Sequence, residues 1–325
     1  MKKKIILTMG DPLGAGPEIV VRTLADRRVR RACIPFAAGS LEYFRAAAEK
    51  AGIGDFDSAV APYIIDIPLP EGAPSVVNAS EYFGTVQAFA GEMAFDSIKK
   101  AHELCVSGGF DAVATAPINK EALRAANIPY IGHTEIFAGL TGAADPLTMF
   151  ETDGLRVFFL TRHLSLREAC DAVTAERIID YIKRSCEALG RMGVNVSAET
   201  PFAVAGLNPH SGEHGLFGDE EIKIIGPAVG QARAEGYNVT GPVSADSVFH
   251  LAHAGRFCGV LSLYHDQGHI ATKTLDFERT ISLTHGLPYL RTSVDHGTAF
   301  DIAWQGKASP VSMKEAVILA AKYAF

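Results

Sequence analysis

Three histidines in this chain of 325 residues each follow, within a few residues, an apolar run typical of a buried β-strand. The three pairs are residues 157–160 with His163, residues 202–205 with His210, and residues 260–263 with His265. Polar groups directly after a buried strand are where α/β proteins place their chemistry. The pattern suggests that three imidazoles meet at one sheet edge, and three imidazoles with an open fourth position are a catalytic metal arrangement. Because the chain has 11 histidines, a structural or solvated role stays open for each one taken singly.

The other histidine pairs predict no metal site. His210 and His214 are four residues apart, but the glycines around them favour a loop, so the ligand spacing of a helix does not apply. His250 and His253 fall on a predicted helix, and we interpret them as surface or packing residues.

Composition limits the class of protein. Hydrophobic residues make up 48% of the chain and charged residues 21%, which is ordinary for a soluble globular enzyme. The length allows one large domain or two domains that share a cleft. A net charge of −7 argues against a general nucleic-acid binder, while local basic patches for an anionic ligand stay open.

Cysteine usage and apolar runs bear on the compartment. The five cysteines are scattered, odd in number and form no Cys-x-x-Cys, which predicts a reducing cytoplasm and argues against a disulfide scaffold. No apolar run approaches the ~18–20 residues of a membrane span, so we expect no membrane partner. The apolar stretch near the N-terminus stops at Gly10, too early for a signal peptide, and a first β-strand is the better interpretation.

The N-terminal stretch predicts a strand, a glycine loop and a helix. The strand covers residues 4–9, and Gly10, Gly14 and Gly16 then let the backbone turn tightly and approach a ligand. Pro17 suits the first turn of a helix. Because the pattern is neither Gly-x-Gly-x-x-Gly nor a P-loop, a cofactor loop and a plain tight turn both stay open.

Strands and helices alternate along the chain, which indicates a doubly wound, mainly parallel sheet. Asp153-Gly154 favours an antiparallel hairpin and suggests a second domain of mixed character. The predicted strands include residues 34–38, 111–116, 147–151 and 155–160, and the predicted helices include residues 41–51, 80–106, 174–192 and 219–235. Ile178, Ile182, Cys186 and Leu189 form a stripe at helical spacing, which predicts core or a subunit contact.

Polar residues near the ends of elements add candidates for proton transfer. Lys120 follows the predicted strand 111–116, and Asp246 lies near the start of a short predicted helix, where helix capping is its alternative role. Ser312-x-x-Glu315 predicts a capping box before the final helix.

Six motifs, in one order over nearly the whole chain, together resemble those of a known family. They are Gly10-Asp-Pro-Leu-Gly-Ala-Gly-Pro-Glu18, Ala116-Pro-Ile-Asn-Lys120, Gly132-His-Thr-Glu135, Gly206-Leu-Asn-Pro-His210, Tyr264-His-Asp-Gln-Gly268 and Leu287-Pro-Tyr-Leu-Arg-Thr-Ser-Val-Asp-His-Gly-Thr-Ala299. The chain resembles the 4-hydroxythreonine-4-phosphate dehydrogenases of vitamin B6 (pyridoxine) biosynthesis and their paralogues, which act on 4-phospho-D-threonate or 4-phospho-D-erythronate.

The resemblance implies a set of site residues. A divalent metal (zinc, magnesium, cobalt or manganese) would be held by His163, His210 and His265. A small anionic hydroxy acid would be bound by His133, Thr134, Lys273, Ser282 and Arg291, with Ser282 at the position of the family's usual Asn. The resemblance also implies a homodimer whose active site is shared, with His265 contributed by the partner subunit.

The wider fold resembles that of isocitrate and isopropylmalate dehydrogenases. This implies two α/β domains with doubly wound, mainly parallel sheets and an active-site cleft between the domains. In that fold NAD binds without a Rossmann domain, and the corresponding residues are Gly10, Gly14, His296, Gly297, Thr298 and Asp301. We expect a discontinuous first domain of residues 1–130 and 292–325, and a second of residues 131–291 that carries the metal ligands and the dimer contact.

The activity that the resemblance implies is NAD-dependent, metal-dependent oxidative decarboxylation of a phosphorylated β-hydroxy acid, with Asp246 and Lys120 as catalytic candidates. Residues 276–282 depart from the family's usual Gly-Phe-Gly-Arg-Gly-Val-Asn-like run, because Asp276 and Glu278 enter, and acids near a phosphate would repel it. An unphosphorylated hydroxy or cis-dihydrodiol carboxylate is therefore an alternative substrate. A non-redox, metal-dependent hydrolase or lyase is the second alternative.

Overall fold

The computed structural model describes residues 2–325 and divides into two compact units. The first unit comprises Met1–Pro146 and Ile281–Phe325, and the second comprises Leu147–Thr280. Where the sequence suggests boundaries at residues 130 and 292, the structure assigns residues 131–146 and 281–291 to the first unit as well. For residues 281–291 the reason is strand pairing, because β10 (Ile281–His285) is antiparallel to β11 (Leu290–Ser293), which is parallel to β4 (Ala112–Thr115).

The strands of the first unit follow the order β3-β2-β1-β4-β11-β10. Besides those named above they are β1 (Lys4–Thr8), β2 (Ile34–Gly39) and β3 (Ile64–Asp66), and every neighbouring pair except β10–β11 is parallel. Because β2 and β4 lie on either side of β1, the chain winds in both directions from that strand. This is a doubly wound sheet, with a topological switch point between β1 and β4.

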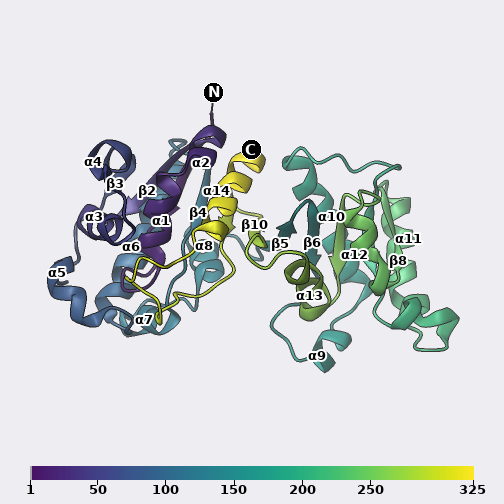
Figure 1. Ribbon diagram of the computed structural model, residues 1–325. Coiled ribbons are helices and arrows are strands. Elements are labelled where there is room, and N and C mark those ends of the chain that lie inside the picture. Colours follow the sequence, from purple (N-terminus) through teal and green to yellow (C-terminus); the bar gives the residue numbers. More distant parts are fainter. Residues whose placement is uncertain (1) are drawn as a thin grey trace. The chain divides into compact units, whose positions relative to one another are not determined.

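Helices surround this sheet, and in Figure 1 the C-terminal helix α14 (Val311–Tyr323) lies beside β4. The others are α1 (Gly16–Leu24), α2 (Arg27–Ala32), α3 (Leu41–Lys50), α4 (Phe56–Ala59), α5 (Val76–Ala79), α6 (Ala88–Val106), α7 (Lys120–Ala125) and α8 (His133–Thr141). On α6 the buried side chains Ala94, Ile98, Ala101 and Cys105 recur every three or four residues, so one face of the helix packs on the core.

The strands of the second unit follow the order β5-β6-β9-β7-β8. They are β5 (Leu147–Thr152), β6 (Leu155–Phe159), β7 (Phe202–Ala205), β8 (Val239–Val243) and β9 (Gly259–Ser262). β5 and β6 form the antiparallel hairpin that Asp153-Gly154 predicts, with Asp153 and Gly154 both at positive φ, and the other neighbouring pairs are parallel.

The helices of the second unit bury the apolar stripe seen in the sequence. They are α9 (Leu166–Asp171), α10 (Ala175–Arg191), α11 (Gly226–Ala234), α12 (Ala245–His253) and α13 (His265–Leu275). Ile178, Ile182 and Leu189 of α10 are 0% exposed within one chain. The stripe is therefore core, and the alternative of a subunit contact is wrong for these three residues.

Three predicted helix starts differ from the structure. The helix expected from residue 80 begins at residue 88, because Gly84 adopts a φ of +76° and donates its N–H to the carbonyl of Leu13, which turns the chain. The predicted capping box is wrong, since Pro310 is the N-cap of α14 and Ser312 lies inside the helix. The helix expected over residues 219–235 consists of a short π-helical segment, Glu221–Ile225, followed by α11.

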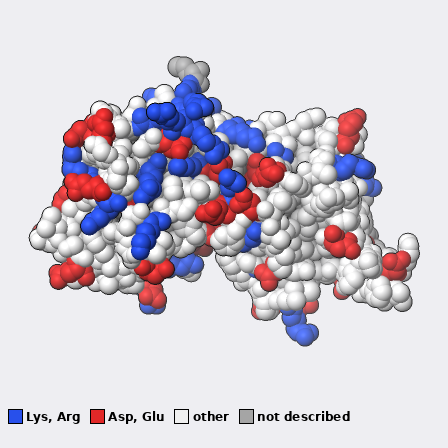
Figure 2. All heavy atoms as spheres, in the orientation of Figure 1, with Lys and Arg blue, Asp and Glu red and all other residues white. Residues whose placement is uncertain are grey.

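Basic side chains gather near the N-terminus on the face of the first unit that Figure 2 shows. Four of the six residues of α2 are arginines. Arg28 among them pairs with Glu315 at 3.1 Å, so part of this charge is neutralised within the unit.

Among residues 2–325, no helix is long and apolar enough to cross a membrane.

Candidate functional site

Three neighbouring strands of the second unit end at one edge of its sheet. β9 lies between β6 and β7 and is parallel to both, so the carboxyl ends of all three strands lie on the same side. His163, His210 and His265 follow these strand ends within a few residues. The structure thus places the start of each histidine-bearing loop at one edge, while the role of the three imidazoles as ligands stays a prediction.

Two buried side chains that the sequence did not single out tie these loop starts together. The Thr161 hydroxyl donates to the Leu263 carbonyl at 2.8 Å. The Gln267 side chain accepts the N–H of Leu263 at 2.7 Å and donates to the Gly206 carbonyl at 2.8 Å. This chain of hydrogen bonds connects the segments before all three histidines, so it fixes their starting points relative to one another.

The surroundings of His265 suit a metal ligand. Its Nδ1 lies 2.7 Å from the carboxylate of Asp266, which leaves Nε2 for another partner. A carboxylate on one ring nitrogen and an ion on the other is the usual arrangement of a metal-binding histidine. The ring of His163 lies 6.0 Å from that of His265, centroid to centroid, and imidazole nitrogens suit several divalent ions. Within residues 2–325 of one chain, no group of three or more His, Cys, Asp or Glu side chains is arranged to hold an ion.

A fourth histidine, His269, packs behind His265. Its ring centroid lies 4.2 Å from that of His265 and also contacts Phe150 and Phe159 at 4.4 and 4.6 Å. Burial lowers the pKa of His269 to about 4, and the neighbouring His265 and Lys273 act in the same direction. The His269 ring is therefore neutral near pH 7, and it packs against His265 and the two phenylalanines.

His210 lies in an unusual left-handed turn. Residues 210–214 all have positive φ, between 42° and 79°, and four of the five carry a Cβ. This conformation costs about 1–2 kcal/mol for each such residue. The exposed His210 ring points its Nδ1 to within 3.8 Å of the Asp246 carboxylate. Ser244 rather than Asp246 is the N-cap of α12, so the structure does not show a capping role for Asp246.

The first unit contains a buried cation with neutral partners. Arg291 of β11 is 4% exposed, and its guanidinium donates to the Thr115 hydroxyl at 2.9 and 3.2 Å and to the Thr284 hydroxyl at 3.0 Å. Its guanidinium carbon lies 5.3 Å from the centre of the Phe137 ring. Burial lowers the pKa of Arg291 to about 9, which still leaves the group charged near neutrality. A buried cation held by hydroxyls rather than by a bonded carboxylate suits an anionic ligand.

His133 and Thr134 begin α8, the helix that also carries Phe137. The Nε2 atom of His133 is buried and has no hydrogen-bond partner among the described residues. Burial, and secondly the charge of Arg291, hold the pKa of His133 well below its ordinary value, so the imidazole is neutral. The start of α8 therefore places the unpaired His133 side chain near the charge of Arg291. This arrangement fits the predicted binding of an anion by these residues.

The remaining predicted polar residues are more dispersed. Ser282 lies on β10, opposite Ser293 of β11. Lys120 is exposed at the start of α7 and lines a groove of about 370 Å³ with Glu121 and Arg124. Lys273 belongs to the second unit, on α13, where its ammonium lies 5.4 Å from the Phe277 ring.

The two segments predicted to bind the cofactor meet within the first unit. The glycine loop follows β1 at the switch point, and the N–H of Asp11 donates to the Pro117 carbonyl that follows β4, at 2.9 Å. The N–H of Ala15 donates to the Thr298 carbonyl at 2.8 Å. A Cβ at Gly14 would lie 2.8 Å from that same carbonyl, so only glycine allows this approach. Open α/β sheets bind ligands at such switch points.

The other predicted cofactor residues belong to the same two segments. A Cβ at Gly10 would lie 2.5 Å from the Pro117 carbonyl, so Gly10 is required both for space and for its φ of +73°. The Nδ1 of His296 lies 2.9 Å from the carbonyl of Gly297. Asp301 is exposed, and its backbone carbonyl accepts a hydrogen bond from the Gln305 side chain at 2.8 Å.

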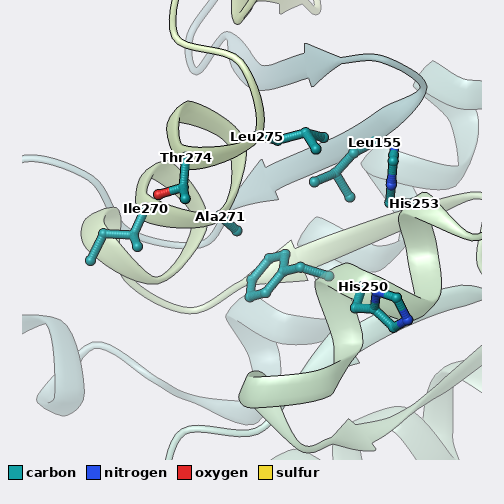
Figure 3. A pocket seen from close by; sticks show the side chains of 8 residues that line it. Leu155, His250, His253, Ile270, Ala271, Thr274 and Leu275 are labelled. Carbon is teal, nitrogen blue, oxygen red and sulfur yellow. The ribbon is translucent and has the colours of Figure 1, made fainter.

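A separate groove of about 390 Å³ crosses the second unit and contains none of the predicted site residues. Figure 3 shows His250 and His253 on one side and Ile270, Ala271, Thr274 and Leu275 of α13 on the other. The Nε2 of His253 lies 3.1 Å from the Asp153 carboxylate. Both histidines lie on α12, as the sequence predicts.

The fold is that of an α/β protein in which the predicted site residues follow strand ends in each of two units. The family described as pyridoxal phosphate biosynthetic protein PdxA matches residues 31–320, and the chain belongs to this family. A Clostridium botulinum relative named "Putative D-threonate 4-phosphate dehydrogenase" is 55% identical over 335 residues, which cover 99% of this chain and 97% of the relative. A Fusobacterium nucleatum relative of the same name is 54% identical over 331 residues, covering 100% and 98%.

Solved structures give the same assignment. The 4-hydroxythreonine-4-phosphate dehydrogenase from Klebsiella pneumoniae is 40% identical, with a TM-score of 0.84 over 100% of this chain and 98% of that chain. A terephthalate 1,2-cis-dihydrodiol dehydrogenase from Burkholderia xenovorans is 27% identical, with a TM-score of 0.67 over 98% of each chain. The fold prediction of a mainly parallel α/β protein of this family is confirmed.

Proposed function

We propose that this chain is an NAD-dependent and divalent-metal-dependent dehydrogenase that oxidises and decarboxylates a phosphorylated β-hydroxy acid. The substrate class is that of 4-phospho-D-threonate, 4-phospho-D-erythronate or 4-hydroxythreonine-4-phosphate. Relatives at 54–55% identity bear the first of these substrates in their names, which favours it. The observation that carries the proposal is the buried Arg291, whose hydrogen bonds go to the neutral hydroxyls of Thr115 and Thr284.

The anionic end of the substrate is assigned to the first unit. Arg291 offers a planar fork of N–H donors that matches a phosphate or carboxylate. The hydroxyls of Thr115 and Thr284 hold that fork in place, and His133 and Thr134 lie at the start of α8 as further contacts. Ser282 belongs to the same unit, and Lys273 of α13 in the second unit is included on the family resemblance alone.

The reacting end is assigned to the three histidines. His163, His210 and His265 would hold the ion, and zinc, magnesium, cobalt and manganese are all compatible with the proposal. A bound divalent ion supplies Lewis acidity, which lowers the pKa of the substrate hydroxyl and stabilises the charge that CO₂ loss develops. Asp246, which lies 3.8 Å from His210, or Lys120 would take the hydroxyl proton.

NAD is assigned to the glycine loop and the segment 296–301. NAD supplies the hydride acceptor. Gly10 and Gly14 let the backbone approach the cofactor, Thr298 contacts the glycine loop, and His296 and Gly297 directly precede it in the sequence. The exposed Asp301 carboxylate would accept hydrogen bonds from ribose hydroxyls and repel a 2′-phosphate, so NAD is expected over NADP.

The alternative of an unphosphorylated substrate rests on Asp276 and Glu278. In the structure Asp276 accepts the N–H of Arg279 at 3.0 Å and pairs with its guanidinium at 2.9 Å. The Arg279 backbone N–H is the main group that lowers the pKa of Asp276. Because Asp276 is neutralised by its own turn, its repulsion of a phosphate is weaker than the sequence alone suggests.

A substrate panel tests the proposal. Purified protein is given NAD, a divalent ion and phosphorylated or unphosphorylated threonate, erythronate and a cis-dihydrodiol carboxylate, while NADH and CO₂ are measured. We expect both products from a phosphorylated acid, and Arg291→Ala should raise KM by about 10–100-fold, with only partial rescue in Arg291→Lys, since Lys lacks the fork. His250→Ala, outside the proposed site, is the control and should match wild type.

Other outcomes would redirect the assignment. Turnover of the cis-dihydrodiol alone would favour the unphosphorylated alternative. Metal-dependent turnover without NADH would favour a hydrolase or lyase.

We further propose a cytoplasmic homodimer whose metal site takes His163 and His210 from one subunit and His265 from its partner.

A further inference from the structure

The loop between β7 and α11 contains a run of backbone that L-residues avoid. Residues 210–214 have φ values of 52°, 53°, 79°, 42° and 55°, and only Gly212 lacks a Cβ. Such a run persists only where the surrounding structure over-determines it. Since His210 is the first residue of the run, whatever holds the turn also sets the direction of this imidazole.

A buried carboxylate anchors the entry to the turn. Glu221 is 4% exposed, and its Oε1 accepts the N–H groups of both Leu207 and Asn208 at 2.7 Å. Its Oε2 accepts the side-chain amide of Asn208 at 2.9 Å. Three hydrogen bonds to an ionised acceptor thus fix the two residues that come just before Pro209 and His210.

The same carboxylate contacts the middle of the turn. A Cβ at Gly212 would lie 2.9 Å from Oε2 of Glu221 and 2.8 Å from the carbonyl of Gly218. The N–H of Phe217 donates to the Gly212 carbonyl at 3.1 Å and closes the loop. Glu221 therefore lies against the turn at both its entry and its centre, without touching His210 itself.

We propose that Glu221 is a positioning residue for the metal site. Its carboxylate holds residues 207 and 208 at the entry and Gly212 at the centre of the left-handed turn of residues 210–214, which presents the exposed His210 ring beside Asp246. The inference rests on the proposed function, because it takes His210 to be a metal ligand. Glu221 acts on the ion only through the backbone and through His210.

Glu221→Gln tests this with little change of shape. Its side-chain NH₂ would face the side-chain amide of Asn208, donor against donor, or else would fail to accept the two backbone N–H groups. We expect the Kd of metal-free protein for Mn²⁺ to rise by about tenfold, as for other residues that orient metal ligands. Glu235→Gln is the matched control, because it removes the same charge within the same unit, where Glu235 pairs with Lys183 at 2.6 Å rather than with the turn. Its Kd should stay near that of wild type.

A double-mutant cycle separates positioning from general damage. In a His210→Ala background, Glu221→Gln should weaken Mn²⁺ binding no further, because its effect passes through the missing ring. In a His265→Ala background, the tenfold loss should persist. Equal further losses in both backgrounds would mean that Glu221 only stabilises the unit, and that result would overturn the proposal.

The experiment distinguishes this inference from the proposed function. If His210→Ala leaves Mn²⁺ affinity unchanged, the metal assignment fails. If His210→Ala weakens binding and Glu221→Gln does not, only the positioning role fails. Should Glu221→Gln not fold, Gly212→Ala disturbs the same contact from the other side and should show the same dependence on His210.

Discussion

At the scale of single residues, Asp11 is a buried acid in the glycine loop. It is 1% exposed, and its Oδ1 accepts the N–H of Leu13 at 2.8 Å. Burial raises the pKa of Asp11 from 3.8 to about 6, although the backbone N–H groups of Leu13 and Gly14 oppose the rise. The folded state therefore binds a proton on Asp11 more tightly than the unfolded chain does.

This shift predicts a pH dependence of stability. Below the unfolded pKa both states are protonated and Asp11 carries no penalty, whereas the penalty is complete above the folded pKa of about 6. Relative to Asp11→Asn, the wild-type protein should lose about 3 kcal/mol of unfolding free energy as the pH rises through this window. Urea unfolding of both proteins between pH 4 and pH 7, about the limits of this window, measures the difference.

An exposed acid provides the control for Asp11. Asp57 pairs with Arg45 at 2.8 Å on the surface, and this contact lowers its pKa. The Asp57→Asn variant should therefore still lose unfolding free energy as the pH rises, as the wild-type protein does. Parallel pH profiles of wild type and Asp11→Asn would contradict the burial argument.

At the scale of elements, the contact between α6 and α7 depends on one glycine. A Cβ at Gly91 of α6 would lie 2.1 Å from the carbonyl oxygen of Ala122 in α7. Gly230 of α11 is also helical, but nothing lies within 4 Å of its Cβ position. The two glycines thus offer the same substitution in crowded and open surroundings.

Alanine at these two positions should change stability in opposite directions. Gly91→Ala should lower the unfolding free energy by about 1–3 kcal/mol, because overpacking outweighs the gain in helix propensity. Gly230→Ala should raise it by about 0.5–1 kcal/mol. Denaturant unfolding measures both changes. Stabilisation by both substitutions would show that α6 and α7 do not pack as closely as the structure has them.

At the scale of the whole molecule, the proposed shared site predicts complementation between two inactive variants. Co-expressed His163→Ala and His265→Ala chains form mixed dimers in which one site carries both lesions. The other site takes His163 and His210 from the second variant and His265 from the first, so it is complete. With random pairing and two equivalent sites, roughly a quarter of wild-type turnover should return. No recovery in mixed dimers verified by mass would place all three histidines in one chain.

Much of this protein is determined locally along its sequence. The apolar strands that precede His163, His210 and His265 are recognisable because a buried parallel strand needs a short, continuous apolar run. Asp153-Gly154 specifies its hairpin turn by backbone conformation alone, and the glycine loop after β1 follows from the same kind of short-range constraint. These features involve only residues within a few positions of one another.

Other features needed the three-dimensional structure. Arg291 bonds to Thr115, 176 residues away, so no local pattern marks Thr115 as its partner. The extent of the first unit depends on the pairing of β10 with β11 and of β11 with β4. The stripe on α10 fits core and subunit contact equally well in sequence, and only the packing of one chain shows it to be core.

The turn that carries His210 shows most clearly what local sequence patterns cannot predict. Four of its five left-handed residues are types that ordinarily avoid this conformation, so propensity alone predicts a different backbone. The buried carboxylate of Glu221, 11 residues after His210, and the close approach of Gly212 and Gly218 impose the turn instead. The sequence by itself determined which elements form and in what order, since those depend on local periodicity. The tertiary structure decided which side chains are buried together, since burial and long-range hydrogen bonds arise only when distant segments pack.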